Sequence, residues 1–218
     1  CAVFYFMLNG IINKKLKGTK AMKIGCVLLA AGAASRFGGG KLCALLGGKP
    51  VIEYTLDNLR DVSFARRAIV AATPELLALA QRYGIDGTVN DRPDLGVSRS
   101  IRMGLELMDG TDACMFCVAD QPLLRRQTLV GMLQSYERGT ILMAAHNGQS
   151  GNPVIYPASL YGELSSLVGE ESGKTVACRH EGLLRVFHVP DSLQLSDIDT
   201  REDLIAAEEF LRDSAHSP

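Results

Sequence analysis

The sequence predicts an α/β fold in which helices cover both faces of a mainly parallel sheet. From residue 22 onward, apolar runs typical of buried strands alternate with helical patterns, which is the order expected of successive βα units. The first run, IGCVLL at residues 24–29, is apolar throughout, as in strands that are buried on both faces of a parallel sheet. A glycine-rich stretch follows this run directly. Together these observations predict a three-layer, doubly wound domain.

Caps and turn residues divide the first part of the chain into regular elements. Pro50 is suited to the first turn of a helix. Thr73 and Pro74 begin the next helix, and Gly84 ends it. Ser98 is expected to cap a further helix. Strands are expected at residues 24–29, 68–72, 85–89, 113–118 and 141–145, and helices at residues 50–59, 74–83, 98–108 and 127–137.

The later part of the chain is less regular. A strand, a helix, an exposed loop and another strand are expected at residues 151–156, 158–167, 169–174 and 184–189. Near the end, Thr200 and Asp203 have the spacing of a capping box, in which each side chain bonds the backbone of the other residue. This pair predicts a final amphipathic helix that reaches about Leu211.

The composition fits a single globular domain, predicted at residues 22–214. The chain has 218 residues, of which 47% are hydrophobic, and a formal net charge of −1. This apolar content is enough for a full core. Because the near-neutral balance offers no basic field, neither nucleic acid nor a membrane surface is expected as a partner.

The first 21 residues differ from the rest. Residues 1–8 are apolar, and residues 13–20 carry four lysines. The apolar stretch is far shorter than the roughly 20 residues that span a bilayer. Its charges follow it instead of preceding it, unlike those of a secretory signal. Since the chain opens with Cys1 and Met22 directly precedes the first strand, we expect residues 1–21 to be an over-extension of the reading frame. An added strand or helix that packs on the domain is the alternative.

Six cysteines raise the question of a metal site or disulfides. Cys114 and Cys117 have the C-x-x-C spacing, but they fall in an expected strand, where residues three apart point to opposite faces. The sequence has no second pair at zinc spacing, so we expect the cysteines to pack as reduced core residues. Reduced thiols predict a cytoplasmic protein.

The glycine-rich stretch at residues 29–41 has the composition of a phosphate-binding loop. It leaves the carboxyl end of the first strand, where open α/β sheets bind ligands. Small residues let backbone N–H groups approach phosphate oxygens, and Arg36 and Lys41 supply charge-assisted contacts. Nucleotide contacts are predicted from Leu29, Ala30, Ala31, Gly32, Arg36 and Lys41, with the two cations also in a catalytic role.

A plain tight turn is the alternative interpretation of this loop. Two other phosphate motifs are excluded by spacing. No Ser or Thr follows Lys41, as the Walker A pattern requires, and the dinucleotide fingerprint G-x-G-x-x-G is absent.

Asp120 directly follows the strand expected at residues 113–118, so we expect it at the same sheet edge as the glycine-rich loop. Mg²⁺ prefers oxygen ligands and is commonly held by one or two carboxylates together with substrate phosphates. We therefore predict Asp120 as a magnesium ligand. A turn or helix-capping residue is the alternative.

Two polar loops are candidates for substrate contacts. Residues 90–102 have the glycine and the polar content of a segment that reads a nucleotide base, with Gly96 and Ser98 as predicted contacts. Helix capping by the serines is an equal alternative. Residues 146–153 provide His146 and Asn152 for an acceptor pocket, with a polar hairpin loop as the alternative.

Four motifs, in order, resemble one family. The stretch L-A-A-G-x-x-x-R-x-G-x-x-K at residues 29–41 resembles the signature of nucleotidyltransferases that activate sugars, isoprenoid precursors and the molybdenum cofactor. Together with V-A-D-Q-P at 118–122, H-N-G-x-x-G-N-P at 146–153 and D-I-D-T-x-E-D-L at 197–204, it is similar to the molybdenum cofactor cytidylyltransferase family. The resemblance implies a nucleotide-diphospho-sugar transferase-like fold and Asp199 as a second Mg²⁺ ligand. A solvated acidic turn is the alternative for Asp199.

Comparison of motifs favours CTP over GTP. Related guanylyltransferases typically carry L-A-G-G in the first loop and G-P-L-A-G in the base-reading loop, whereas this chain has Ala30-Ala31 and Gly96-Val97-Ser98. Two features depart from the cytidylyltransferase pattern. Arg99 interrupts a run of serines, and residues 169–174 read GEESGK where relatives usually have G-D-x-G-x-R. These departures bear on the acceptor more than on the reaction.

The resemblance implies transfer of CMP from CTP to molybdopterin-bound molybdenum, giving a cytosine dinucleotide cofactor and pyrophosphate. Because a phosphate nucleophile is anionic at neutral pH, positioning and charge neutralisation suffice without a general base. Docking to a molybdenum hydroxylase would follow from this role. The alternatives are a nucleotidyltransferase with GTP or another nucleotide and a sugar or isoprenoid phosphate acceptor, an oxidoreductase, which lacks a dinucleotide fingerprint here, and a non-catalytic maturation factor, which would need neither carboxylate.

Overall fold

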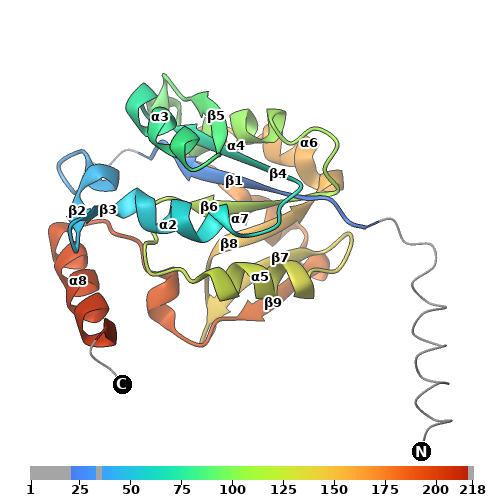
Figure 1. Ribbon diagram of the computed structural model, residues 1–218. Coiled ribbons are helices and arrows are strands. Elements are labelled where there is room, and N and C mark those ends of the chain that lie inside the picture. Colours follow the sequence, from blue (N-terminus) through green and yellow to red (C-terminus); the bar gives the residue numbers. More distant parts are fainter. Residues whose placement is uncertain (1–20, 33–35, 216–218) are drawn as a thin grey trace, which may run out of the picture.

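A seven-stranded sheet lies at the centre of the computed structural model, which describes residues 21–32 and 36–215 (Figure 1). The strand order is β5-β4-β1-β6-β8-β7-β9. The strands are β1 (Ile24–Ala30), β4 (Arg66–Ala71), β5 (Asp86–Val89), β6 (Ala113–Val118), β7 (Ile141–His146), β8 (Gln149–Pro157) and β9 (Leu184–His188), and a separate hairpin is made of β2 (Leu45–Leu46) and β3 (Lys49–Pro50).

The sheet is parallel apart from β8. Strand β1 pairs in parallel with β4 and β6, β4 with β5, and β7 with β9, whereas β8 runs antiparallel to β6 and β7. Along the chain, β1 is followed by β4 and β5 on one side of it, and the chain then crosses to β6 on the other side. The carboxyl ends of β1 and β6 therefore flank a switch point, where sheets of this kind bind ligands.

Helices cover both faces of the sheet and complete a three-layer fold. The helices are α2 (Val51–Arg60), α3 (Pro74–Arg82), α4 (Val97–Glu106), α5 (Arg126–Ser135), α6 (Tyr161–Ser165), α7 (Gly173–Arg179) and α8 (Arg201–Ala215), with short 3-10 turns η1 (Lys41–Cys43), η2 (Pro93–Leu95), η3 (Ala158–Leu160), η4 (Glu181–Leu183) and η5 (Ser192–Leu195). Apolar residues of α2, α3, α5 and α8 join one buried cluster, and those of α4, α6 and α7 join another. The predicted α/β class with a mainly parallel sheet is confirmed.

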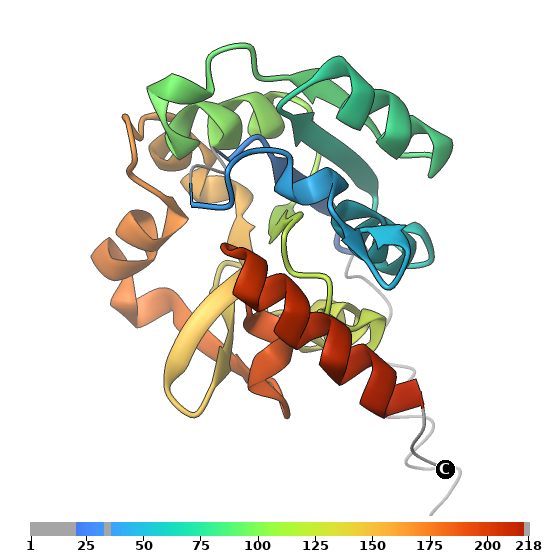
Figure 2. The same ribbon diagram turned by 90° about the vertical axis from the view of Figure 1, so that its left-hand side faces the viewer.

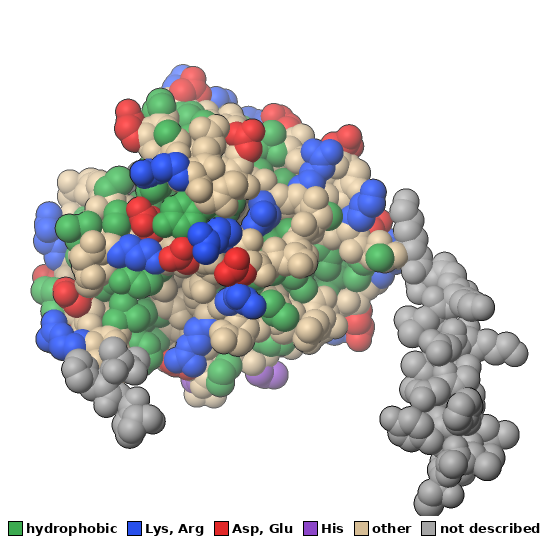
Figure 3. All heavy atoms as spheres, in the orientation of Figure 1, with side chains coloured by type: hydrophobic (Ala, Val, Ile, Leu, Met, Phe, Trp, Pro, Cys, Tyr) green, Lys and Arg blue, Asp and Glu red, His purple; other side chains and the backbone are tan. Residues whose placement is uncertain are grey.

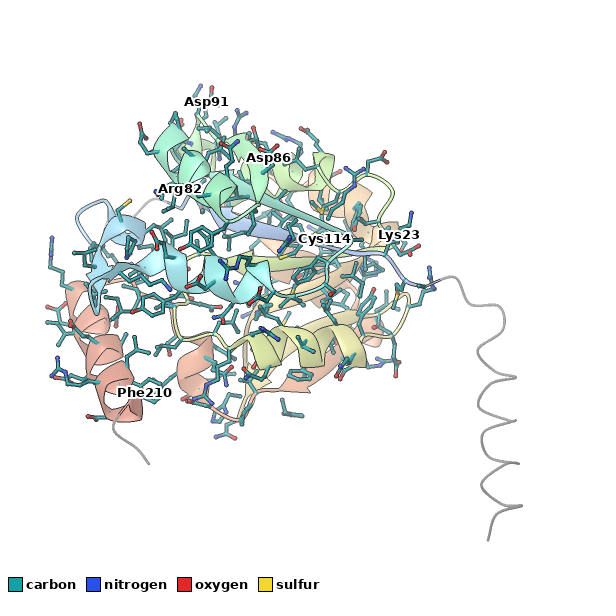
Figure 4. All side chains as sticks on the ribbon, in the orientation of Figure 1. Lys23, Arg82, Asp86, Asp91, Cys114 and Phe210 are labelled. Atoms are coloured by element: carbon teal, nitrogen blue, oxygen red, sulfur yellow. The ribbon has the colours of Figure 1, made fainter. Side chains whose placement is uncertain are left out.

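Alternation along the strands supplies both clusters. On β1, Leu28 belongs to the first cluster and Val27 to the second, because successive side chains of a strand point to opposite faces. Cys117 and Cys114 on β6 divide in the same way, as predicted. Figure 4 shows Cys114 within the sheet.

Three predictions of local structure are wrong. Gly96, whose φ of 86° favours glycine, precedes α4, so Ser98 lies inside the helix and does not cap it. The helix expected at residues 158–167 is divided into η3 and α6, and the loop expected at residues 169–174 ends early, because a further helix, α7, begins at Gly173. By contrast, the capping box is confirmed: Asp203 Oδ2 accepts from the Thr200 N–H at 2.7 Å, and Thr200 Oγ1 accepts from the Asp203 N–H at 3.1 Å.

Residues 1–20 lie outside the described residues, so the N-terminal extension stays a prediction. In the part of the chain that the structure describes, no helix is long and apolar enough to cross a membrane. Lys and Arg side chains are interspersed with Asp and Glu side chains on the face that Figure 3 shows. Charge on that face is mixed and does not form a field of one sign.

Candidate active site

The segments with the predicted phosphate and metal residues meet at the carboxyl edge of the sheet. The segment that follows β1 and the start of α8 both lie on the side that faces the viewer in Figure 2. The turn after β6 joins them, because the Ile198 N–H donates to the Asp120 carbonyl at 2.8 Å. Residues far apart in the sequence therefore share one site.

Three glycines with positive φ precede Lys41 and position it at this site. Gly38, Gly39 and Gly40 have φ values of 85°, 94° and 64°, a region that other residues adopt at a cost. The Gly40 carbonyl then accepts from the Cys43 N–H at 3.0 Å, which starts η1 with Lys41 as its first residue. The glycine-rich turn thus fixes the direction in which the lysine leaves the backbone.

The Lys41 ammonium lies between two carboxylates. Its Nζ is 2.5 Å from Asp120 Oδ2 and 3.2 Å from Asp199 Oδ1. The Lys41 side chain is 11% exposed, against 18% for Asp120 and 32% for Asp199. Burial alone lowers the pKa of Lys41, but hydrogen bonds and charge from the two aspartates outweigh it, so the pKa is raised. Lys41 is therefore a fixed positive charge.

Arg36 brings a second cation to the same cluster. Its guanidinium lies 2.9 Å from Asp199 Oδ2, and its side chain is 74% exposed. An exposed ion pair of this kind contributes little to stability. Arg36 can therefore leave the Asp199 carboxylate and bind a phosphate group at little cost in stability.

A third carboxylate, Asp197, is close enough to the two metal candidates for their charges to act on it. Burial is the main cause that raises its pKa to about 6, and the negative charge of Asp120 adds to it. Gln121 opposes the shift by donating Nε2 to Asp197 Oδ1 at 2.9 Å. Sequence reasoning placed Asp197 in a motif without giving it a role, although the D-x-D spacing was a signal for it.

Asp197→Asn is expected to stabilise the metal-free protein more at pH 7.5 than at pH 4. An aspartate whose folded pKa exceeds its unfolded value binds more protons when folded, so its contribution to stability falls as pH rises from about 4 to 6. Melting temperatures in EDTA at the two pH values measure this difference. The exposed Asp109→Asn is the control, and an equal shift for Asp197→Asn at both pH values would contradict the expectation.

A cavity of about 370 Å³ opens beside Lys41 and Asp120. Seven predicted residues line it, namely Leu29, Ala30, Ala31, Gly32, Lys41, Gly96 and Asp120. Arg36 and Asp199 adjoin it through the ion pairs of Lys41 and Asp199. Ser98 is not among the lining residues, whereas Ser100 and Glu170 are. Ser100 lines the cavity in place of the predicted Ser98 because α4 begins at Val97, and this start turns Ser100 toward the cavity and Ser98 away from it.

At the wall of this cavity, Gly96 lies close to the segment before α7. A Cβ at Gly96 would lie 2.1 Å from the Gly169 carbonyl oxygen, and the Ser98 N–H donates to that oxygen at 3.2 Å. No side chain fits at Gly96 unless one of the two segments moves.

Gly96→Ala is expected to lower both the melting temperature and nucleotide affinity. An alanine at this position is strained by the positive φ and also clashes with Gly169. The two effects together should lower the free energy of unfolding by at least about 1 kcal/mol more than strain at a positive φ alone. Gly110→Ala is the matched control, because Gly110 has a φ of 73° and open space around it. Thermal melts of the two variants give the comparison, and equal losses would contradict the close contact.

A second cavity, of about 270 Å³, adjoins the first and shares Leu29, Val97 and Val118 with it. Its walls are apolar, and its polar residues include Asn152 and Lys174. The predicted acceptor residue Asn152 thus lies at this cavity. His146 lines neither cavity: its Nδ1 donates to the Val189 carbonyl at 2.8 Å, and its Nε2 accepts from Asn147 at 3.0 Å.

The donor set fits a hard divalent cation. Asp120 and Asp199 are close enough to share one ammonium group, and both offer the oxygen ligands that Mg²⁺ prefers. Beside them, the buried Gln121 Oε1 has no hydrogen-bond partner among the described residues, which leaves an acceptor for a metal-bound water. Asp120 and Asp199 would hold the ion.

Solved structures share this fold. Rv0371c from Mycobacterium tuberculosis H37Rv matches with a TM-score of 0.75 at 22% identity, covering 87% of this chain and 100% of that one. A manganese complex of Rv0371c matches with a TM-score of 0.69 at 22% identity, covering 86% and 99%. CMP:2-keto-3-deoxy-manno-octonic acid synthetase complexed with CTP matches with a TM-score of 0.71 at 15% identity, covering 88% and 99%. The chain has the nucleotide-diphospho-sugar transferase-like α/β fold.

Sequence comparison gives the family. A family model for the MobA-like NTP transferase domain matches residues 26–183, so the chain belongs to this family of nucleotidyltransferases. A probable molybdenum cofactor guanylyltransferase of Pyrococcus furiosus is 27% identical over 202 residues, which cover 88% of this chain and 100% of the relative. Another from Pyrococcus horikoshii is 29% identical over 94 residues, which cover 42% of this chain and 49% of the relative, about half its length. The nucleotidyltransferase prediction is confirmed, and the choice of CTP stays a prediction.

Proposed function

We propose that this protein transfers the nucleoside monophosphate of an NTP to the terminal phosphate of a molybdopterin-type acceptor. The convergence of Lys41 with Asp120 and Asp199 beside a lined cavity carries the proposal. Cations and metal-binding carboxylates at one sheet edge are what a triphosphate and its metal require. Family membership supports the reaction class, and the names of the two Pyrococcus relatives support the acceptor.

Two nucleotides are candidates, each favoured by a specific observation. The names of the relatives favour GTP. The first loop favours CTP, since Ala30-Ala31 stands where guanylyltransferases typically have an alanine-glycine pair, and both alanines line the nucleotide cavity. The reaction is otherwise the same for both nucleotides.

The second cavity is proposed to take the acceptor. It adjoins the nucleotide cavity through shared walls, so an acceptor phosphate there would lie close to the triphosphate. Apolar walls that include Phe116 and Met143 suit a flat pterin ring, and Lys174 offers a positive charge to an anionic group. Asn152 would orient polar atoms of the ring.

Catalysis would depend on positioning and charge. An acceptor phosphate oxygen attacks the α-phosphorus of the NTP. The bond between the α-phosphorus and the oxygen that bridges it to the β-phosphorus breaks, and pyrophosphate leaves with the electron pair. Lys41 and Arg36 hold the triphosphate and balance the negative charge that builds up on it. When bound at Asp120 and Asp199, a divalent cation supplies further charge neutralisation.

Initial rates of pyrophosphate release test the proposal. The protein is supplied with Mg²⁺, molybdenum-loaded molybdopterin and each of the four NTPs in turn. We expect release with either GTP or CTP to exceed that with the other three nucleotides at least tenfold, and the better nucleotide decides between guanylyl and cytidylyl transfer. Similar rates with all four, or no release with any, would contradict the proposal.

A further inference from the structure

A buried asparagine outside the nucleotide cavity bonds a serine that lines it. Asn90 follows β5 and is 0% exposed, and Ser100 on α4 is 4% exposed. Asn90 Nδ2 lies 3.0 Å from Ser100 Oγ. Ser100 lines the nucleotide cavity, while Asn90 lies behind it. The asparagine can therefore act on a ligand through the serine.

Two donors fix the orientation of the Asn90 amide. Its Oδ1 accepts from the Arg92 backbone N–H at 3.0 Å and from Arg99 Nε at 2.8 Å. Neither group can accept a hydrogen bond, so the side facing them must be the amide oxygen. The NH₂ group must then face Ser100.

Arg99 is itself held in place. The Arg99 Nη2 atom lies 2.6 Å from Asp91 Oδ1, and Figure 4 shows Asp91 at the outer margin of the molecule. The residue that interrupts the serine run of related sequences thus points away from the nucleotide cavity. It locks the amide that faces Ser100.

This locked amide determines what Ser100 can do. Because Asn90 donates to Ser100 Oγ, the serine accepts on that side and has its own proton left. No acceptor for that proton lies within bonding distance among the residues that the structure describes. The hydroxyl therefore keeps a proton that it can donate into the cavity.

We infer that Asn90 is a positioning residue that fixes Ser100 as a donor to an accepting atom of the nucleotide base. The accepting atom is of the kind that a carbonyl oxygen of cytosine or guanine provides. The inference rests on the proposed function for the presence of a nucleotide in this cavity. It adds the polarity of one specific contact and assigns a role to Asn90 and Arg99.

Dissociation constants for the nucleotide test this role in the full chain. Calorimetric titration with Mg²⁺ uses whichever NTP the unchanged protein binds best. Ser100→Ala removes one hydrogen bond and should raise Kd about three- to tenfold. Asn90→Asp keeps the shape and the two bonds from Arg92 and Arg99, but its other oxygen accepts the Ser100 proton. Ser100 then faces the base as an acceptor, and Kd should rise at least as much as for Ser100→Ala.

The double variant separates the effect that Asn90 has through its hydrogen bond to Ser100, here called the relay, from other effects of Asn90. In the Ser100→Ala background, Asn90→Asp should change Kd by less than twofold, because the relay is already broken. A further rise would show that Asn90 acts through charge or loop structure and would overturn the inference. Melting temperatures confirm that each variant is folded, and Ser135→Ala on the exposed end of α5 is the serine control. If the unchanged protein binds no NTP, the proposed function fails; if it binds one and Asn90→Asp has no effect, the inference alone fails.

Discussion

Asp120→Asn is expected to lower kcat/KM for nucleotidyl transfer at least a hundredfold, or about 2.7 kcal/mol of transition-state stabilisation. The substitution keeps the size of the side chain and removes the negative charge that would hold the metal. It also removes one of the two carboxylates around Lys41. The loss should appear mainly in kcat, because the charge of the metal is needed most as pyrophosphate departs.

Asp109→Asn is the matched control for this variant. Asp109 is exposed and lies between α4 and β6, at the amino end of the strand that Asp120 follows. Its replacement should leave kcat/KM within about twofold. If Asp120→Asn retains more than a third of the rate of the unchanged protein, Asp120 is not the metal ligand.

Lys41→Met is expected to lower kcat/KM by a similar factor for a different reason. Methionine keeps an apolar chain of similar length and loses the charge that would contact the triphosphate. The variant should also bind Mn²⁺ more tightly than the unchanged protein when no nucleotide is present. This follows because the ammonium that lies between Asp120 and Asp199 no longer competes with the cation.

Steady-state kinetics and Mn²⁺ titration measured by electron paramagnetic resonance report the two effects separately. Lys23→Met is the control, because Lys23 directly precedes β1, at the opposite end of the strand from the glycine-rich loop (Figure 4). If Lys41→Met binds Mn²⁺ more weakly, the lysine supports the metal site instead of occupying it. Unchanged kinetics would remove Lys41 from the catalytic site.

The strands of the sheet could be predicted from the sequence because their signals are local. The continuous apolar run of β1 and the run of β6 mark strands buried on both faces. The direction of β8 could not be predicted, since its pairing with β6 and β7 depends on contacts between distant segments. Helix α7 was missed because it has only seven residues and begins inside the polar, glycine-containing segment 169–174, where Ser172 at its N-cap position also suits a loop.

The candidate site divides in the same way. Spacing placed Lys41 and Asp120 after their strands, and parallel strands bring such residues to one edge. The choice of Ser98 over Ser100 depended on the first residue of α4, which sequence patterns locate to within a few residues at best. The relay through Asn90 depends on side-chain contacts between β5 and α4, for which the sequence holds no local signal.

Transfer of label from an [α-³²P]NTP to the acceptor tests the central claim most directly. GTP and CTP are each supplied with Mg²⁺ and molybdenum-loaded molybdopterin. The products are then separated and identified by mass spectrometry. The expected result is a labelled dinucleotide that forms with one of the two nucleotides, requires the acceptor and disappears with Asp120→Asn. Absence of a labelled acceptor product, or release of labelled monophosphate at the same rate without acceptor, would contradict it.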